Sequence, residues 1–276
     1  MPAQSTEFHG QAAMRLALPQ GDTCLVALHG AQLLSWMTAD GVERLYLSPK
    51  ALLDGQSAIR GGVPICWPQF NQRGALAKHG FARNLAWQAA SGEGGELVLT
   101  LHDSTATRAV WPYAFRLRFT VTLAPGQLRM ALGVTNCGDT PWPFAAALHT
   151  YLRVDDIAQT RLEGLQGAQR WDAVRDQRYA EGAKALQFDG EFDSVYATPA
   201  GPLRLVQPAG TLQIAQSANC TETVIWNPGA ALSAGLADMP GDGFRHMLCV
   251  EAARIDENVT LQPGGQWQAW QQLTVL

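Results

Sequence analysis

The sequence lacks the features that mark membrane and secreted proteins. No uninterrupted apolar run is long enough to cross a bilayer, and the first residues have neither the basic start nor the apolar core of a secretory signal. Its five cysteines are scattered, odd in number and without a C-x-x-C pair, which supports neither a disulfide framework nor a cysteine zinc site. Reduced, buried thiols fit a reducing compartment, so we expect a cytoplasmic protein that does not contact a membrane.

Motifs for metals and nucleotides are also missing. There is no H-E-x-x-H sequence, no phosphate-binding P-loop and no dinucleotide fingerprint, and the six histidines lie far apart. A net charge of −4 argues against a nucleic-acid partner, which would favour a basic surface. We therefore expect no metal, and any anion that binds must be met by local cations.

What is present is a succession of short strands. The segment 115–123 alternates apolar and polar residues with a period of two, which predicts a half-buried strand, and a turn at 124–127 joins it to a second strand. Similar runs separated by Gly and Pro turns continue to the end of the chain. Helical periodicity is scarce, and the best short-helix segments are 48–53 and 231–237. The pattern predicts an all-β protein, a large antiparallel sandwich, in which residues 1–276 form one domain.

One segment, 60–83, is too rich in Gly, Pro and cations to be a regular element. It contains Arg60, Arg73, Lys78, His79 and Arg83. A solvated loop with incidental cations explains this composition as well as an anion-binding loop does.

Two ionisable residues lie in apolar strands. In the segment 247–253, Glu251 is the only carboxylate, and burial would raise its pKa toward a value suited to a general base. His149 ends the apolar run that starts at Pro143 and shares a strand face with Tyr151. A carboxylate held by a structural cation and a core histidine with one hydrogen bond are the alternative interpretations. Together, however, the two side chains could form an acid and base pair.

Six motifs in order resemble those of the hexose-6-phosphate mutarotases, a branch of the aldose 1-epimerase family. They are R-G-G-V-P-I-C-W-P from Arg60, H-G-F-A-R from His79, H-T-Y-L-R-V from His149, D-S-V-Y from Asp193, W-N-P from Trp226 and C-V-E-A from Cys249. The resemblance runs from about Arg60 to the end and, more loosely, to the start. It implies a galactose mutarotase-like β-supersandwich and interconversion of the α and β anomers of a hexose 6-phosphate without a cofactor.

The resemblance also implies roles for individual residues. Glu251 would take the proton of the anomeric hydroxyl, and His149 would deliver one to the ring oxygen. Arg60 and Arg83 would bind the phosphate, because a guanidinium offers two parallel hydrogen bonds to its oxygens. His79 and Asp193 would hold sugar hydroxyls.

The chain also departs from the family pattern. Relatives often have a basic residue after the aspartate of the D-x-x-Y motif, where this chain has Ser194. Arg73 and Lys78 are further candidates for phosphate contact. We expect Trp67 and Trp226 to be core residues or walls of the site, with the core favoured.

Two other functions remain open from the sequence. Nine tryptophans on a β-sandwich would also suit a non-catalytic carbohydrate-binding module, which would not need Glu251. A mutarotase for unphosphorylated aldoses would not need the cations near Arg60. The expected partner is a small-molecule sugar phosphate, and a large single domain with one site is expected to be a monomer.

Overall fold

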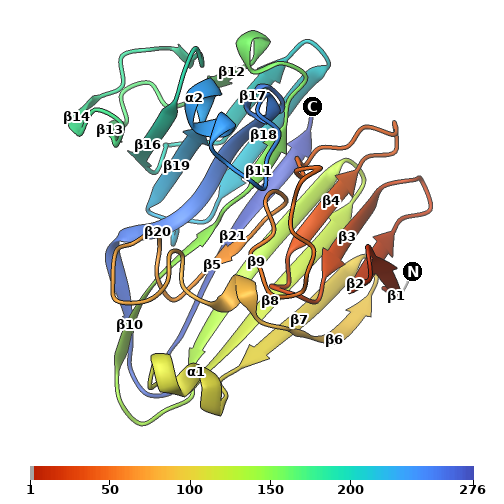
Figure 1. Ribbon diagram of the computed structural model, residues 1–276, viewed down its shortest axis with the longest axis vertical. Helices are drawn as coiled ribbons and strands as arrows, with labels where there is room; N and C mark the ends of the chain where they lie inside the picture. The colour runs from red at the N-terminus through yellow and green to blue at the C-terminus, as the bar shows by residue number, and fades with distance from the viewer. Residues whose placement is uncertain (1–2) are drawn as a thin grey trace.

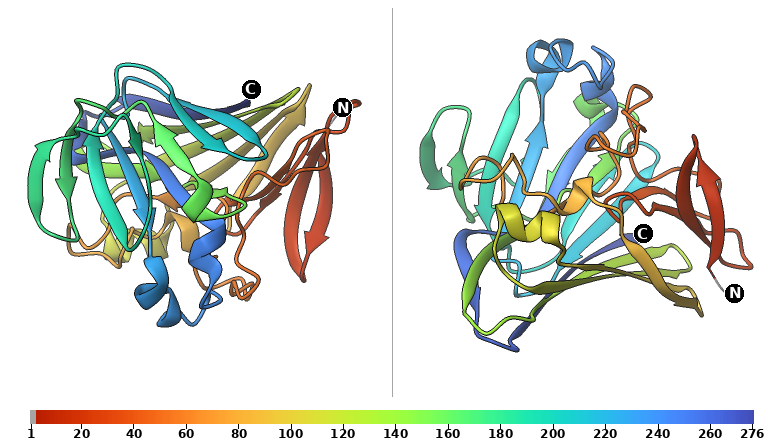
Figure 2. Two further views of the ribbon diagram at one scale, coloured as in Figure 1. Left: turned by 90° about the horizontal axis from the view of Figure 1, so that it is seen from above. Right: turned by 60° about the horizontal axis from the view of Figure 1, so that its bottom comes forward.

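The computed structural model describes residues 3–276, which fold mainly into three antiparallel sheets (Figure 1). The first sheet has four strands in the order β1-β2-β3-β4 and lies to one side of the two larger sheets (Figure 2). Its strands are β1 (Gln4–Phe8), β2 (Gln11–Ala17), β3 (Thr23–Ala27) and β4 (Leu33–Met37).

The second sheet has eight strands. Seven follow the order β14-β13-β16-β19-β20-β10-β5, and β11 also pairs with β20. Their bounds are β5 (Ile65–Cys66), β10 (Trp142–Leu148), β11 (Tyr151–Arg153), β13 (Gln169–Asp172), β14 (Gln177–Ala180), β16 (Phe192–Ala197), β19 (Glu222–Asn227) and β20 (Met247–Leu261).

The third sheet has nine strands in the order β15-β12-β17-β18-β21-β9-β8-β7-β6, so that β21 at the carboxyl end pairs with β9 (Figure 1). The strands are β6 (Gln88–Glu93), β7 (Glu96–His102), β8 (Phe115–Ala124), β9 (Gln127–Asn136), β12 (Arg161–Glu163), β15 (Ala185–Leu186), β17 (Leu203–Gln207), β18 (Gly210–Gln216) and β21 (Gln266–Val275).

The expected alternation is realised in β8, where the apolar positions are buried and the polar positions face outward. A core cluster that includes Leu16 of β2, Trp36 of β4, Phe119 of β8, Val250 of β20 and Leu273 of β21 joins the three sheets. The all-β class predicted from the sequence is therefore confirmed.

Helices are few and short: α1 (Thr105–Val110), α2 (Gly229–Ala234) and the 3₁₀ turns η1 (Ala82–Asn84), η2 (Ile157–Gln159) and η3 (Gly243–His246). Among the described residues, none of these helices has the length and apolar character needed to cross a membrane. The helix expected at 231–237 is present as α2, which begins two residues earlier. The helix expected at 48–53 is wrong, because Ser48 starts a single turn and its hydroxyl donates to the carbonyl of Asp238 at 2.6 Å.

Candidate active site

A cavity of about 280 Å³ lies over the eight-stranded sheet, and most side chains singled out in the sequence line it. Its walls come from β11, β16, β19 and β20, from α2, and from the loop 60–83. The lining residues are Arg60, Phe70, Asn71, Lys78, His79, Arg83, His149, Tyr151, Glu191, Asp193, Val224, Trp226, Leu232, Leu236 and Glu251.

Glu251 lies in β20, a central strand with β19 on one side and β10 and β11 on the other. It is opposite Val224 of β19, and only 1% of the residue is exposed. Because side chains alternate along a strand, Cys249 and Glu251 project to the same side. The sheet therefore holds this carboxylate at the floor of the cavity.

His149 lies where two strands are interrupted. The segment that the sequence predicts as one strand breaks after Leu148, and β11 begins at Tyr151. The loop beside it takes over the backbone bonds, since His149 N–H donates to Pro64 O at 3.0 Å and Tyr151 N–H donates to Gly62 O at 2.9 Å. The glycine is needed there: Gly62 has φ of +60°, and a Cβ would collide with the carbonyl oxygen of Leu33.

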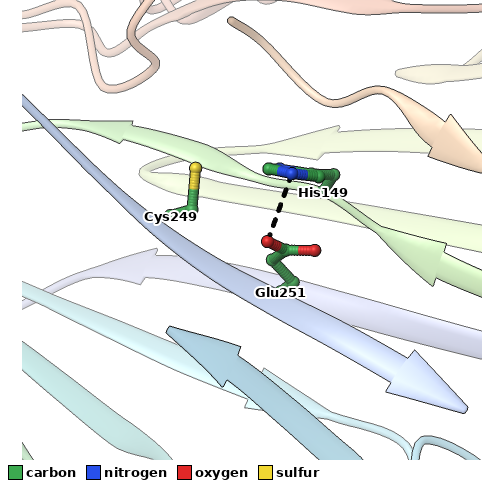
Figure 3. Close-up of side chains that lie close together, drawn as sticks. All are labelled: His149, Cys249 and Glu251. Atoms are coloured by element: carbon green, nitrogen blue, oxygen red, sulfur yellow. Dashed lines mark ion pairs between the residues drawn. The ribbon is translucent and has the colours of Figure 1, made fainter. Parts of the chain in front are cut away.

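The two buried groups meet in the cavity. His149 Nε2 lies 3.3 Å from Glu251 Oε1, and the glutamate side chain points toward the imidazole (Figure 3). The other polar atom of each side chain, His149 Nδ1 and Glu251 Oε2, is buried without a hydrogen-bond partner. A buried polar atom without a partner is costly, so both groups are available to a bound molecule that carries hydroxyls.

Burial sets the resting protonation of this pair. It raises the pKa of Glu251 well above its ordinary value, and the charge of Asp193 adds to the rise. Burial also lowers the pKa of His149 well below its ordinary value, and His79, Arg83 and Arg60 lower it further. Burial therefore favours the neutral form of both groups, with one proton on the carboxyl group, and transfer of that proton across 3.3 Å would give the carboxylate and imidazolium form.

His79 is held neutral beside the pair. Burial and the nearby cations Arg83, Lys78 and Arg60 lower its pKa to about 3. Its Nδ1 accepts the N–H of Asn71 at 3.2 Å, so the ring proton lies on Nε2. Its backbone has φ of +67°, an uncommon conformation for a residue with a side chain, and the ring lies 5.4 Å from that of His149.

Two hydrogen bonds fix the position of the Arg60 guanidinium. Its Nε donates to Asp238 Oδ2 at 3.1 Å, and its Nη1 donates to Tyr151 Oη at 3.1 Å. Burial disfavours the charge of this guanidinium, but Tyr151 and Asp238 outweigh burial and raise its pKa. Part of the guanidinium still lines the cavity.

Tyr151 connects this anchored arginine to the histidine. Its ring stacks on that of His149 with centroids 4.9 Å apart and an angle of 11° between the planes. The sequence places Tyr151 on the face of His149 but assigns it no role, and it offers no local signal for Asp238. The structure shows a continuous chain of contacts from Asp238 through Arg60 and Tyr151 to His149.

Lys78 and Arg83 add two cations to the cavity. Within the described residues neither makes an ion pair, and Arg83 Nε is buried without a hydrogen-bond partner. Arg83 Nη2 donates to Lys78 O at 2.9 Å, which holds the two residues together. Their free donors can therefore meet an anion.

Arg73 does not reach the cavity. It pairs with Asp256 at 2.8 Å and donates to Ile255 O at 3.0 Å, beside the ring of Trp171. Among the cations expected in this loop, it is the one that the structure places elsewhere.

Ser194 also points away from the cavity, because Asp193 precedes it on the same strand and faces inward. Ser194 is fully buried and accepts a hydrogen bond from Arg170 Nε at 3.0 Å. The serine therefore removes no cation from the cavity, and Arg170 of β13 supplies a guanidinium on the far side of the strand.

Asp193 lines the cavity, and burial together with the charge of Glu191 raises its pKa. The two tryptophans divide between the expected places. Trp67 is fully buried among aromatic rings such as that of Phe115, whereas Trp226 lines the cavity.

Cys249 lies next to the acid and base pair (Figure 3). The ligand atoms of His149, Cys249 and Glu251 lie within 4.8 Å of one another, a set of donors that could hold a metal ion. Burial raises the pKa of the thiol well above its ordinary value, which opposes the thiolate that a metal requires. The cations in the same cavity would also repel a divalent metal ion, so the charges of the site favour proton transfer over metal binding.

A family model described as aldose 1-epimerase matches residues 14–274. The chain belongs to the aldose 1-epimerase family. Its relatives include a candidate glucose-6-phosphate 1-epimerase of Cenchrus ciliaris, 33% identical over 88% of this chain and 78% of the relative. A protein of the same name from Escherichia coli K12 is 37% identical over 84% of this chain and 79% of the relative.

Solved structures agree with this family membership. The crystal structure of a candidate mutarotase from Salmonella typhimurium has a TM-score of 0.90 and 30% identity, and covers 99% of this chain and 93% of its own. The family predicted from six motifs is thus confirmed for this epimerase. The mutarotase-like fold predicted with it is confirmed as well.

Proposed function

We propose that this epimerase interconverts the α and β anomers of a hexose 6-phosphate, with glucose 6-phosphate as the first substrate to test. The observation that carries the proposal is the buried His149 and Glu251 pair, 3.3 Å apart at the floor of a cavity with cations in its wall. The names of the relatives support the same substrate class. A carbohydrate-binding module is not favoured, because it would not need such a pair.

The reaction needs one proton removed and one delivered. The Glu251 carboxylate takes the proton of the anomeric hydroxyl, and the electron pair of that O–H bond forms the C1 carbonyl. The C1–O5 bond breaks, its electron pair moves to the ring oxygen, and protonated His149 supplies a proton there. Rotation about C1–C2 and closure on the other face reverse these steps, so the pair ends with the one proton it began with.

The other lining residues position the sugar phosphate. Lys78 and Arg83 bind the phosphate with their free donors, and Arg60 contributes the part of its guanidinium that Asp238 and Tyr151 leave free. His79, through its Nε2–H, and Asp193 hold hydroxyl groups. Asp238 and Tyr151 act as positioning residues.

We further propose that residues 1–276 act as one monomeric domain in the cytoplasm. The core cluster shared by the three sheets supports a single domain. Four of the five free cysteines are buried, which is consistent with a reducing compartment.

Anomer exchange followed by NMR tests the function. Saturation transfer between the anomeric protons of glucose 6-phosphate should show enzyme-dependent exchange at equilibrium, and free galactose should exchange more slowly. Glu251→Gln and His149→Asn should each lose about 10²- to 10⁴-fold of the rate, the typical contribution of one proton transfer. Failure of the wild type on every sugar phosphate would refute the proposal, and full activity of Glu251→Gln would refute the assignment of the base. Preference for the phosphate that survives the double change Arg60→Ala and Arg83→Ala would refute the phosphate contacts.

A further inference from the structure

The nine-stranded sheet carries a second hollow, of about 650 Å³, on the face that is turned away from its buried side. In the right-hand view of Figure 2 this sheet forms the lower margin of the molecule. The paired residues of β7, β8, β9 and β21 form two rows across the hollow. One row is Thr100, Arg118, Gly133 and Gln268, and the next is His102, Arg116, Thr135 and Gln266.

Gly133 provides the depth of this hollow. It lies in the interior of β9 between Arg118 and Gln268, and a Cβ there would meet nothing closer than 3.6 Å. Glycine weakens the interior of a strand, and its presence often marks a place where another molecule approaches the backbone closely. The position could hold a side chain, yet it is left open.

The polar side chains around Gly133 are unengaged. Within the described residues, none of the other seven side chains of the two rows makes an ion pair or a hydrogen bond, and no carboxylate lines the hollow. Arg116 and Arg118 are exposed and lie two residues apart on one strand face, about 7 Å by strand geometry. Two like charges so close repel each other, on a protein whose net charge is −4.

The cations cover only a short stretch of the sheet, which limits the ligand to a small molecule. The next row along the sheet, which contains Thr120, Ala131 and Trp270, has no cation. Arg129, one row further, already lies over the ring of Trp270 at 3.9 Å. An extended polyanion would need a longer basic stripe, whereas two arginines match one phosphate group.

We propose that this hollow is a second binding site, separate from the catalytic cavity, for a small phosphate monoester that carries hydroxyl groups, such as a sugar phosphate. Arg116 and Arg118 bind the phosphate. The amides of Gln266 and Gln268 and the threonine hydroxyls each offer both donors and acceptors, as sugar hydroxyls require. The proposal does not rest on the catalytic function, since it uses other residues on another sheet.

The test is a titration of the ¹⁵N-labelled full chain with glucose 6-phosphate, inorganic phosphate and glucose, followed by two-dimensional NMR. Glucose 6-phosphate should shift the amides of residues 100–102, 116–118, 133–135 and 266–268 as a separate, saturable set. The double variant Arg116→Gln and Arg118→Gln should weaken binding at this set at least about tenfold and leave anomer exchange unchanged. The matched control Arg204→Gln, an exposed arginine on the same sheet, should leave the shifts as in the wild type.

Free glucose should bind the set at least about tenfold more weakly than glucose 6-phosphate. Absence of shifts at these amides would overturn the proposal, and so would shifts that persist in the double variant. Equal binding of inorganic phosphate and glucose 6-phosphate would reveal an adventitious anion site only and would overturn the assignment to a sugar phosphate.

Discussion

The ion pair between Arg60 and Asp238 predicts an unusual kinetic effect of Asp238→Asn. The two charges approach to 3.1 Å, and their side chains are only 23% and 21% exposed. With an effective dielectric constant of 20, the Coulomb energy at this distance is about 5 kcal/mol. Desolvation and the hydrogen bond that an asparagine can still accept reduce the net loss, so Arg60 should lose about 1.5–3 kcal/mol of anchoring.

This loss should appear in kcat and not in substrate binding. A loosened Arg60 no longer fixes the hydroxyl of Tyr151, and the ring stacked on His149 becomes less well positioned. If about 1.4 kcal/mol reaches the transition state, kcat falls about tenfold. KM for glucose 6-phosphate should stay level or fall, because the guanidinium released by Asp238 can turn its charge toward the phosphate.

The assay is line-shape or saturation-transfer NMR of anomer exchange at several substrate concentrations, which separates kcat from KM. Asp242→Asn is the matched control, since Asp242 is exposed on the same loop and its side chain makes no hydrogen bond or ion pair within the described residues. A raised KM with an unchanged kcat would refute the positioning role and would assign the aspartate to substrate binding. Unchanged constants in both variants would refute it too.

Three further results are expected. Activity should fall as the pH drops through the lowered pKa of His149, below 6.5, because the pair then gains a second proton. Activity should also fall as the pH rises through the raised pKa of Glu251, because the pair then loses its single proton. A rate of exchange that varies in the opposite sense would contradict the one-proton pair. In urea melts, Gly62→Ala should lower the free energy of unfolding by at least about 1 kcal/mol more than Gly10→Ala. Both positions have positive φ, but only Gly62 is close to other backbone atoms. Equal losses of unfolding free energy in the two variants would exclude the collision. Inorganic phosphate or phosphite should accelerate anomer exchange of free glucose, since an anion beside the cations offsets their effect on His149, and inhibition alone would show that phosphate acts only by binding.

Local patterns in the sequence were enough to predict the strands and to single out His149 and Glu251, which the structure places together in one cavity. The alternation in 115–123 gave the correct buried face of β8, because a strand covered on one side imposes a period of two. Glu251 was recognisable because a lone carboxylate in an apolar strand is costly unless it is used. The break at His149 was missed, since it depends on the loop at 62–64 taking backbone bonds from the strand, and no residue in 143–154 encodes that partner.

Side-chain pairings between distant segments could not be predicted in the same way. Arg60 and Asp238 are 178 positions apart, and only the folded sheets bring them together. Arg73 and Lys78 lie five residues apart in one loop, yet the first pairs with Asp256 and the second lines the cavity. Composition does not distinguish these two cations, and the path of the backbone between them decides which one lines the cavity.

In the proposed mechanism the cavity cations would link phosphate binding to proton transfer. Arg83 and Arg60 lower the pKa of His149, while Lys78 and Arg83 oppose the rise in the pKa of Glu251. A phosphate dianion bound beside them offsets their charge, so it raises the proton affinity of the imidazole that they otherwise hold neutral. In the proposed mechanism the bound phosphate would therefore favour the protonated imidazole, and the same charge would also raise the pKa of Glu251, whose carboxylate is the base. A sugar without a phosphate would meet the same two reacting groups, but with the imidazole deprotonated, so the phosphate would act on the rate as well as on binding.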